Sequence, residues 1–164
     1  MGSVKPGDLA ACFEAWAAPL ALLARSCGAD AHAEDLVQDA FVKAVRHRGR
    51  IKDLKAWLFV AVRHAALNQT RDERRRSAID RARAESTSGW FVPRTDVAID
   101  AQEMTASLEQ LPPEQREAVV MRIWGQMTLQ EIARLTGRPL STIHNQYHAA
   151  LEQLRKRMAR DEQQ

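Results

Sequence analysis

Residues 127–158 read MTLQEIARLTGRPLSTIHNQYHAALEQLRKRM, two helical patterns joined by a break at residues 136–139. The first pattern repeats apolar side chains at helical spacing, at Leu129, Ile132, Ala133 and Leu135. Gly137 can adopt the left-handed conformation that ends a helix, and Pro139 prevents the helix from continuing. The second pattern repeats them at Ile143, Tyr147, Ala150, Leu151 and Leu154. The stretch therefore predicts two helices that meet at a tight turn.

Both expected helices have residues suited to their N-termini. Thr128 followed by Glu131 has the spacing of a capping box, and we expect Ser141 to cap the second helix. Ala133 is small enough for the helices to approach closely, and Ile143 falls where it can pack back onto the first helix. These features together are typical of a helix-turn-helix.

The outward face of the second helix is short and polar. It carries Ser141, Thr142, His144, Asn145, Gln146 and His148. A helix with such a face fits the major groove and presents hydrogen-bonding groups to base edges, whereas an ordinary helical hairpin would expose it only to solvent. The agreement of cap, turn glycine and buried isoleucine favours DNA binding. Asn145 and Gln146 suit the N6/N7 edge of adenine, which favours an A/T-containing site.

Composition indicates an all-α protein without a catalytic or metal centre. In 164 residues there is no sustained alternation of apolar and polar side chains, so strands are not expected. No nucleotide-binding loop, nucleophile elbow or zinc motif is present, and Cys12 and Cys27 lack metal-ligand spacing. His144 and His148 are four residues apart but lack a third ligand. We expect no cofactor, no metal and no enzymatic activity.

Membrane segments and targeting signals are also not expected. The apolar runs are shorter than a bilayer-spanning helix requires, and the N-terminus does not resemble a signal peptide. We expect a cytoplasmic protein.

The net charge of +3 conceals a strong segregation along the chain. Residues 1–42 contain two basic and six acidic side chains, a net charge of −4, whereas residues 43–76 contain eleven basic and three acidic ones, a net charge of +8. The basic block lies far in sequence from the helix-turn-helix. It therefore predicts a second phosphate-binding surface.

Two helices are expected before the basic block. Residues 1–28 form the first, with Pro19 kinking or splitting it and an inner stripe of Leu9, Phe13, Trp16, Leu20 and Leu23. The second begins near Asp30 and buries Leu36, Val37, Ala40, Phe41, Ala44 and Val45. Its outer face is acidic, with Glu34, Asp35, Gln38 and Asp39. That face is either solvated or a docking surface for a basic partner.

A third helix follows the basic connector of residues 46–53, and Asp53 is its expected cap. Its expected inner stripe is Leu54, Trp57, Leu58, Ala61 and Ala65, and its candidate exposed residues are Lys55, Arg63, His64, Asn68 and Arg71. Residues 77–104 lose helical periodicity and gain Ser, Thr, Gly and Pro, as a flexible linker does. From Leu108 the helical pattern returns, with Pro112 and Pro113 starting a helix whose apolar side chains are Ala118, Val119, Met121, Ile123 and Trp124. We therefore expect two small helical bundles, residues 1–76 and 105–164, the second of about four helices.

Three segments in this order resemble one protein family. AEDLVQDAF at residues 33–41, KAWLFVAVRHAAL at residues 55–67, and LEQLPPEQREAVVMRIWGQMTLQEIARLTGRPLSTIHNQYHAALEQLRKR at residues 108–157 are similar to the extracytoplasmic-function (ECF) sigma factors of bacterial RNA polymerase. The resemblance covers nearly the whole chain and is far more specific than the helix-turn-helix alone.

The resemblance implies a promoter-specificity subunit with three sets of site residues. Region 2 would bind the polymerase clamp helices through Asp35, Leu36, Gln38, Asp39 and Phe41. It would read and melt the −10 element through Arg46, Arg48, Arg50, Lys52, Lys55, Arg63, His64, Asn68 and Arg71. Region 4 would dock on the polymerase flap and read the −35 element through Arg138, Ser141, Thr142, His144, Asn145, Gln146 and His148. An anti-sigma factor is a further candidate partner.

The chain departs from the family in its third helix, where the common Arg-Asn pair is Arg63-His64, and in its recognition helix. Many relatives carry Lys or Arg in the recognition helix, roughly where His144, Gln146 and Ala149 stand here. Two other functions therefore remain open. A stand-alone helix-turn-helix regulator would leave the basic block, acidic helix and linker without a use, and a degenerate sigma-like protein that sequesters a partner would fit the nearly neutral recognition helix.

Overall fold

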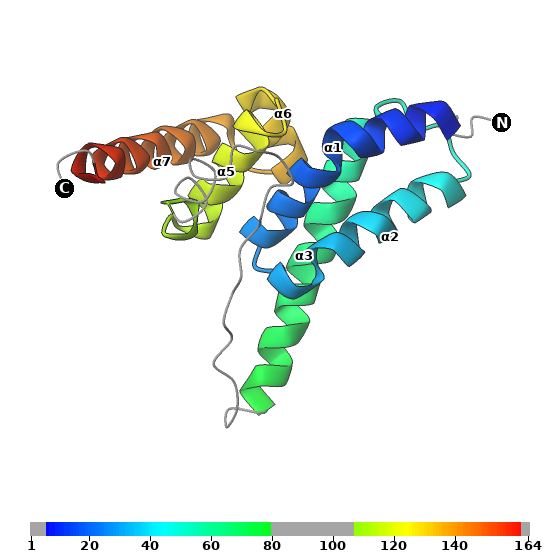
Figure 1. The fold of residues 1–164 in the computed structure, drawn as a ribbon, viewed down its shortest axis with the longest axis horizontal. Coiled ribbons are helices and arrows are strands. Elements are labelled where there is room, and N and C mark those ends of the chain that lie inside the picture. Colours follow the sequence, from blue (N-terminus) through cyan, green and yellow to red (C-terminus); the bar gives the residue numbers. More distant parts are fainter. Residues whose placement is uncertain (1–5, 80–106, 162–164) are drawn as a thin grey trace. The chain divides into compact units, whose positions relative to one another are not determined.

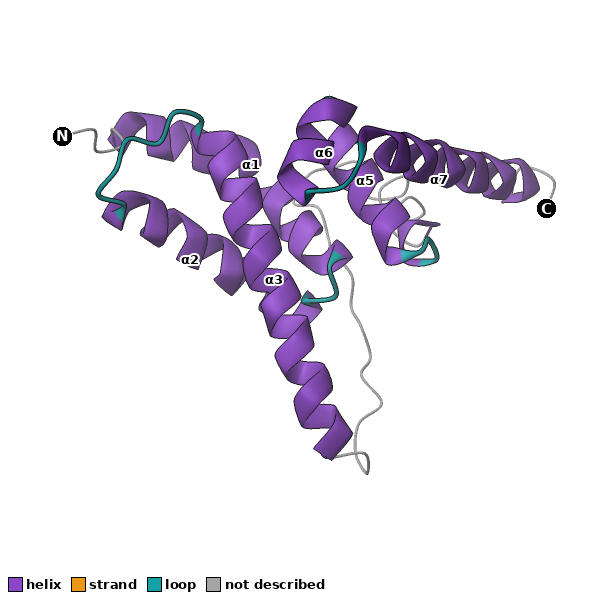
Figure 2. Ribbon diagram, turned by 180° about the vertical axis from the view of Figure 1, so that it is seen from behind, coloured by secondary structure: helices purple, strands orange, loops and turns teal. Residues whose placement is uncertain are grey.

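The computed structural model describes residues 6–79 and 107–161, and within these ranges every regular element is a helix (Figure 1, Figure 2). The all-α expectation is confirmed. The chain divides into two compact units, residues 1–87 and 88–164. The expected linker falls mostly on residues 80–106, including Trp90 and Phe91, which lie outside the described residues.

The N-terminal unit consists of three long helices and one short turn. Helix α1 spans Pro6–Ser26, the 3-10 turn η1 spans Asp30–His32, α2 spans Ala33–Arg46 and α3 spans Leu54–Ile79. Each of the three α-helices packs against the other two (Figure 1). The core lies between them and includes Leu20, Leu23, Val37, Phe41, Leu58, Phe59 and Val62.

Helix α1 differs in part from the sequence expectation. It runs without interruption through Pro19, so of the two expected outcomes, a kink or a split, the split does not occur. Phe13 is 45% exposed rather than buried, because the tightly covered part of α1 is its C-terminal portion, Leu20–Ser26. By length and composition alone, Gly7–Ser26 could cross a membrane, which the apolar runs in the sequence had not led us to expect. The core helix of a soluble protein passes the same test, and residues 20–26 are buried in the bundle.

The buried stripe of α3 is offset from the predicted one. The structure fully buries Leu58, Phe59, Val62 and Ala66, whereas Trp57, Ala61 and Ala65 are only half-buried. Because LFVAV is apolar at every position, its periodicity does not fix which side faces inward. Contact with both α1 and α2 decides the orientation. In α2, Val45 is 54% exposed, so its predicted burial is also wrong.

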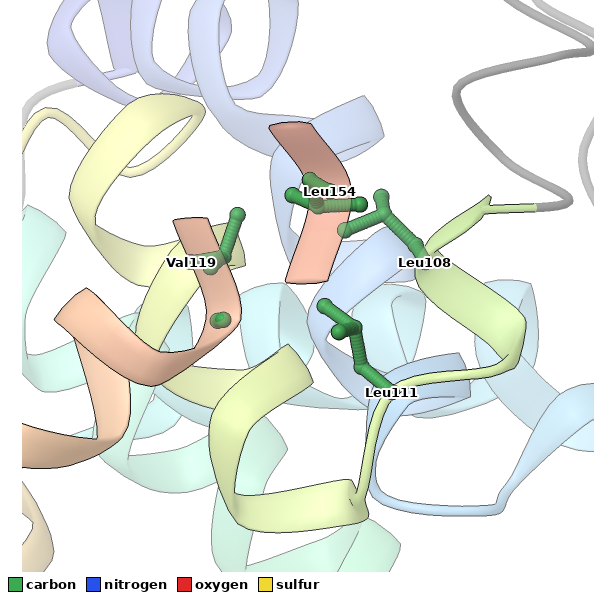
Figure 3. Close-up of a cluster of buried hydrophobic side chains, with 5 residues drawn as sticks. Leu108, Leu111, Val119 and Leu154 are labelled. Carbon is green, nitrogen blue, oxygen red and sulfur yellow. The ribbon is translucent and has the colours of Figure 1, made fainter. Parts of the chain in front are cut away.

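The C-terminal unit is a smaller bundle. A helical segment at residues 107–109 is followed by α5 (Pro113–Ile123), α6 (Leu129–Thr136) and α7 (Leu140–Asp161). Helix α5 begins at the proline pair as predicted, with Pro112 as its N-cap. Figure 3 shows one buried cluster, formed by Leu108, Leu111, Val119, Ala150 and Leu154. Trp124 and Tyr147 pack against this cluster. Ile123, expected in this core, is exposed.

Candidate nucleic-acid interface

Local features that the sequence predicted define both ends of α6, the first helix of the motif. The Thr128 amide donates to Glu131 Oε2 at 2.7 Å, and the Glu131 amide donates to Thr128 Oγ1 at 3.2 Å, which completes the capping box. Gly137 ends α6 with φ of 68°, in the left-handed region. Ile132 and Ile143 are fully buried between the two helices. These features form the predicted helix-turn-helix.

The start of α7 differs from the prediction by two residues. The helix begins at Leu140, so Ser141 lies inside its first turn and is not the cap. The carbonyl of Pro139 accepts from the amides of Thr142 at 3.0 Å and Ile143 at 3.2 Å. Pro139 therefore occupies the capping position, which suits a residue with fixed φ. Ser141 is exposed and free of the capping role.

The predicted recognition face is open to solvent. Ser141, His144, Asn145 and His148 are exposed, and Thr142 and Gln146 are partly exposed. The rings of His144 and His148 lie close together, with centroids 4.1 Å apart. Among the residues that the structure describes, no group of three or more potential ligands could hold a metal ion. The face therefore offers neutral hydrogen-bonding groups to a partner.

Arg138 differs from the other predicted −35 residues because its guanidinium already has partners. Its Nη1 lies 3.2 Å from Oε2 of the buried Glu117 on α5. The same nitrogen donates to Gln146 Oε1 at 3.5 Å. Arg138 thus connects the bundle core to the recognition helix, and Glu117 is a residue that the sequence interpretation missed. The one hint in the sequence is that Glu117 directly precedes the apolar run of residues 118–121.

A second polar surface lies between α2 and α3. Arg46, Arg48, Arg50 and Lys52 are all exposed on this connector. The connector ends where Asp53 Oδ1 accepts from the amide of Ala56 at 2.9 Å, which confirms the predicted cap of α3. Four cations within seven residues produce a concentrated positive potential, because few acidic groups stand near them in sequence.

The predicted exposed residues of α3 fall into three groups. His64, Asn68 and Arg71 are exposed, as expected. Lys55 is half-buried, with its ammonium 4.3 Å from the centroid of the Trp16 ring, a cation–π contact. Arg63 is only 7% exposed, so its assignment to the open face is wrong. It lies on the buried side because it is four residues after Phe59 and three before Ala66.

The acidic face of α2 is exposed, with one exception among its predicted contacts. Asp35, Gln38 and Asp39 are exposed and Leu36 is half-buried. Phe41 is buried, and its ring packs against that of Phe13 on α1 with the ring centroids 5.1 Å apart. Its side chain therefore stabilises the packing of α2 on α1. Two exposed valines continue this face along α2: Val42 is four residues after Gln38, and Val45 is seven residues after it. The sequence interpretation had placed Val45 in the buried stripe and had not assigned Val42.

Comparisons with known proteins identify the family to which the chain belongs. Residues 13–76 match the family model for sigma-70 region 2, and residues 101–154 match that for sigma-70 region 4. Over 137 residues the chain is 29% identical to the RNA polymerase sigma factor CarQ of Myxococcus xanthus, covering 82% of this chain and 79% of that protein. Over 136 residues it is 28% identical to the ECF sigma factor SigL of Mycobacterium tuberculosis, covering 80% and 77%. The chain belongs to the ECF sigma factors.

Solved structures agree with this assignment. The sigma factor RpoE of Bartonella quintana, in complex with the anti-sigma factor NepR, is similar with a TM-score of 0.73 and 27% identity, covering 91% of this chain and 95% of that one. CnrH, in complex with the cytosolic domain of CnrY, shares the fold with a TM-score of 0.61 and 23% identity, covering 96% and 91%. The protein is an RNA polymerase sigma factor, and the alternative of a stand-alone regulator is not favoured.

The two family matches locate the surfaces within the sigma factor. Region 2 contains α2, the basic connector and most of α3. Region 4 contains α5, α6 and the part of α7 that carries the recognition face. The acidic and basic surfaces thus both belong to region 2, and the neutral polar face belongs to region 4.

Proposed function

We propose that this sigma factor divides promoter recognition between its two units. In region 2, Asp35, Leu36, Gln38 and Asp39 bind the polymerase clamp helices, while the connector and the exposed face of α3 capture the −10 element. In region 4, α7 reads the −35 element from the major groove and the unit docks on the polymerase flap. Four of the five polymerase residues expected from the sequence are kept; Phe41 is left out because it is buried.

The observation that supports the proposal most strongly is the opposite charge of two neighbouring segments in region 2. The exposed carboxylates of α2 suit a basic protein partner, whereas the exposed cations that follow it suit phosphates. A stand-alone DNA-binding unit needs only the second surface. A subunit that holds both a protein machine and DNA needs both.

The nine residues expected at the −10 element have different proposed roles, which depend on their exposure. Arg46, Arg48, Arg50 and Lys52 are open for phosphate contact, and His64, Asn68 and Arg71 are open for contact with exposed bases. Unstacking a base costs a few kcal/mol, so side chains must receive it. Arg63 and Lys55 act instead from within region 2, where they hold α3 in place.

We infer that the protein acts in the cytoplasm, where the polymerase and DNA are, and that the polymerase performs the chemistry. An anti-sigma factor is a further proposed partner. The structural relative RpoE was solved with such a partner, and the exposed valines of α2 are a surface that a protein partner would cover.

In vitro transcription tests the proposal directly. Core polymerase with the full chain should initiate from a small, related set of sequences in a randomised promoter library. Sequencing the transcripts should reveal two separated elements. Core polymerase alone supplies the control. Initiation that does not depend on the chain, or tight promoter binding by the free chain without polymerase, would favour a different kind of regulator.

A further inference from the structure

A chain of three polar side chains connects the core of region 4 to the recognition face. Glu117 on α5 is 4% exposed, and its Oε2 lies 3.2 Å from Arg138 Nη1 in the turn. That nitrogen also donates to Oε1 of Gln146 on α7, at 3.5 Å. The three residues come from α5, from the turn between α6 and α7, and from α7, all within one unit.

The chemistry of these groups determines which end of the Gln146 amide faces Arg138. A guanidinium has five N–H donors and no acceptor, so it can receive only the carbonyl end of an amide. A buried carboxylate strongly favours a cation beside it, because its charge has lost most of its hydration. Glu117 therefore holds Arg138 in the turn, and Arg138 holds the oxygen of Gln146 inward.

We propose that Gln146 presents its NH₂ group to promoter DNA as a hydrogen-bond donor, with its amide oriented by Glu117 and Arg138; this rests on the proposed −35 function of α7. A glutamine free at both ends pairs with adenine by accepting from N6 and donating to N7. Because its oxygen is turned inward to Arg138, Gln146 presents its NH₂ group outward. That group suits the acceptor edges of guanine (O6 and N7) and thymine (O4).

This assignment changes two roles expected from the sequence. Arg138 is a positioning residue and not a phosphate contact, because its charge is neutralised by Glu117. Gln146 loses its match to adenine, while Asn145, which is exposed at the neighbouring position, is unaffected.

The test is a transcription selection with core polymerase, the full chain and a library randomised over the −35 segment. The variant Gln146→Ala first identifies the position that Gln146 reads, as the one whose base preference flattens. In Arg138→Met the glutamine oxygen is released, so adenine at that position should rise relative to guanine and thymine by about fivefold or more. Glu117→Gln removes the charge that holds Arg138 and should shift the preference in the same direction.

Glu152→Gln is the matched control. It breaks an exposed ion pair on the same helix, between Glu152 and Lys156 at 2.7 Å, and should leave every base preference unchanged. Preferences are ratios among templates used by the folded fraction, so a loss of stability in the Glu117 or Arg138 variants does not by itself produce a shift.

Each result distinguishes the inference from the function on which it rests. If Gln146→Ala flattens one position but neither Arg138→Met nor Glu117→Gln raises adenine there, the orienting role is refuted and −35 reading stands. If Gln146→Ala flattens no position, Gln146 does not read bases and the inference fails alone. If the unaltered protein shows no −35 preference, both proposals fail.

Discussion

At the scale of single residues, Gly137 places a backbone constraint on the turn between α6 and α7. Its φ of 68° is unfavourable for a side chain with a Cβ, and an added Cβ would meet no other atom within 4 Å. The glycine is therefore required for backbone conformation and not for space. Because space is not limiting, a substitution at Gly137 measures the cost of the left-handed backbone conformation alone.

We predict that Gly137→Ala lowers the free energy of unfolding of region 4 by about 1 kcal/mol, because the turn must hold an alanine in the left-handed region. Gly137→Asn should cost less, since asparagine enters that region more readily. Urea denaturation of the full chain, followed by circular dichroism, measures both. Equal stability of the alanine variant and the parent would show that the turn relaxes elsewhere.

A second residue-scale prediction concerns Cys12. Burial, and then the negative charge of Asp53, raise the pKa of this thiol above its ordinary value. In a Cys27→Ser background, alkylation of Cys12 by iodoacetamide should therefore need a higher pH than alkylation of a free cysteine. Asp53→Asn keeps a capping oxygen for α3 but removes the charge, so the pH midpoint should move part of the way back. A midpoint unchanged by that substitution would show that Asp53 does not act on the thiol.

At the scale of elements, the sequence predicted helices well and their orientation less well. The capping box at Thr128 and the proline start of α5 depend on near neighbours, so local pattern was sufficient. The orientation of α3 depends on contacts with α1 and α2, which lie far away in sequence. Because the inward side of α3 was misassigned, Arg63 was wrongly placed on the open face.

The site residues follow the same division. Short polar side chains on α7 and the cations of the connector are exposed as predicted, because no apolar pattern competes for those positions. Phe41 was given a binding role from family resemblance, although its own periodicity marked it as core. Glu117 was missed because the sequence alone does not reveal that its partner, Arg138, lies across the turn.

Helix α2 gives a prediction at this scale. Reversing the charge of Asp35 and Asp39 together should abolish association with core polymerase while leaving the circular dichroism spectrum unchanged, because both side chains are exposed. Phe41→Ala should instead lower the stability of region 2, by about 3–5 kcal/mol, as expected for a buried aromatic side chain. Association is measured by co-purification with polymerase.

Glu14→Lys is the control for the charge reversal, since Glu14 is an exposed acidic residue on α1 rather than α2. It should not affect association. Normal association of the Asp35 and Asp39 variant would remove the docking role of α2.

At the scale of the whole molecule, the positive charge is concentrated in region 2, while the proposed −35 face in region 4 is neutral. Promoter elements about twenty base pairs apart lie roughly 70 Å from each other at 3.4 Å per base pair, a span better matched by two units than by one small domain. The units are therefore expected to contribute differently to promoter affinity. We expect region 2 to supply most of the phosphate contact and region 4 to supply mainly base selection.

Salt dependence tests this division. We predict that replacing Arg46, Arg48 and Arg50 together by glutamine reduces the slope of log affinity against log salt by about 2–3, because each lost phosphate contact removes about 0.7–0.9. The measurement is promoter binding by the assembled polymerase complex. Arg160→Gln, at the exposed end of α7, is the control and should leave the slope unchanged. An unchanged slope in the triple variant would show that the connector does not contact phosphates.

Finally, the burial of Leu20 and Leu23 against helices further along the chain has a consequence for biosynthesis. The ribosome completes α1 about forty residues before it reaches Ala66, the last fully buried residue of α3. At a translation rate of about 5–20 residues per second, the apolar side of α1 stays uncovered for roughly 2–8 seconds before α3 has been synthesised. During that interval the nascent chain presents a leucine-rich surface to chaperones, and the speed of translation through α2 and α3 sets how long it does so.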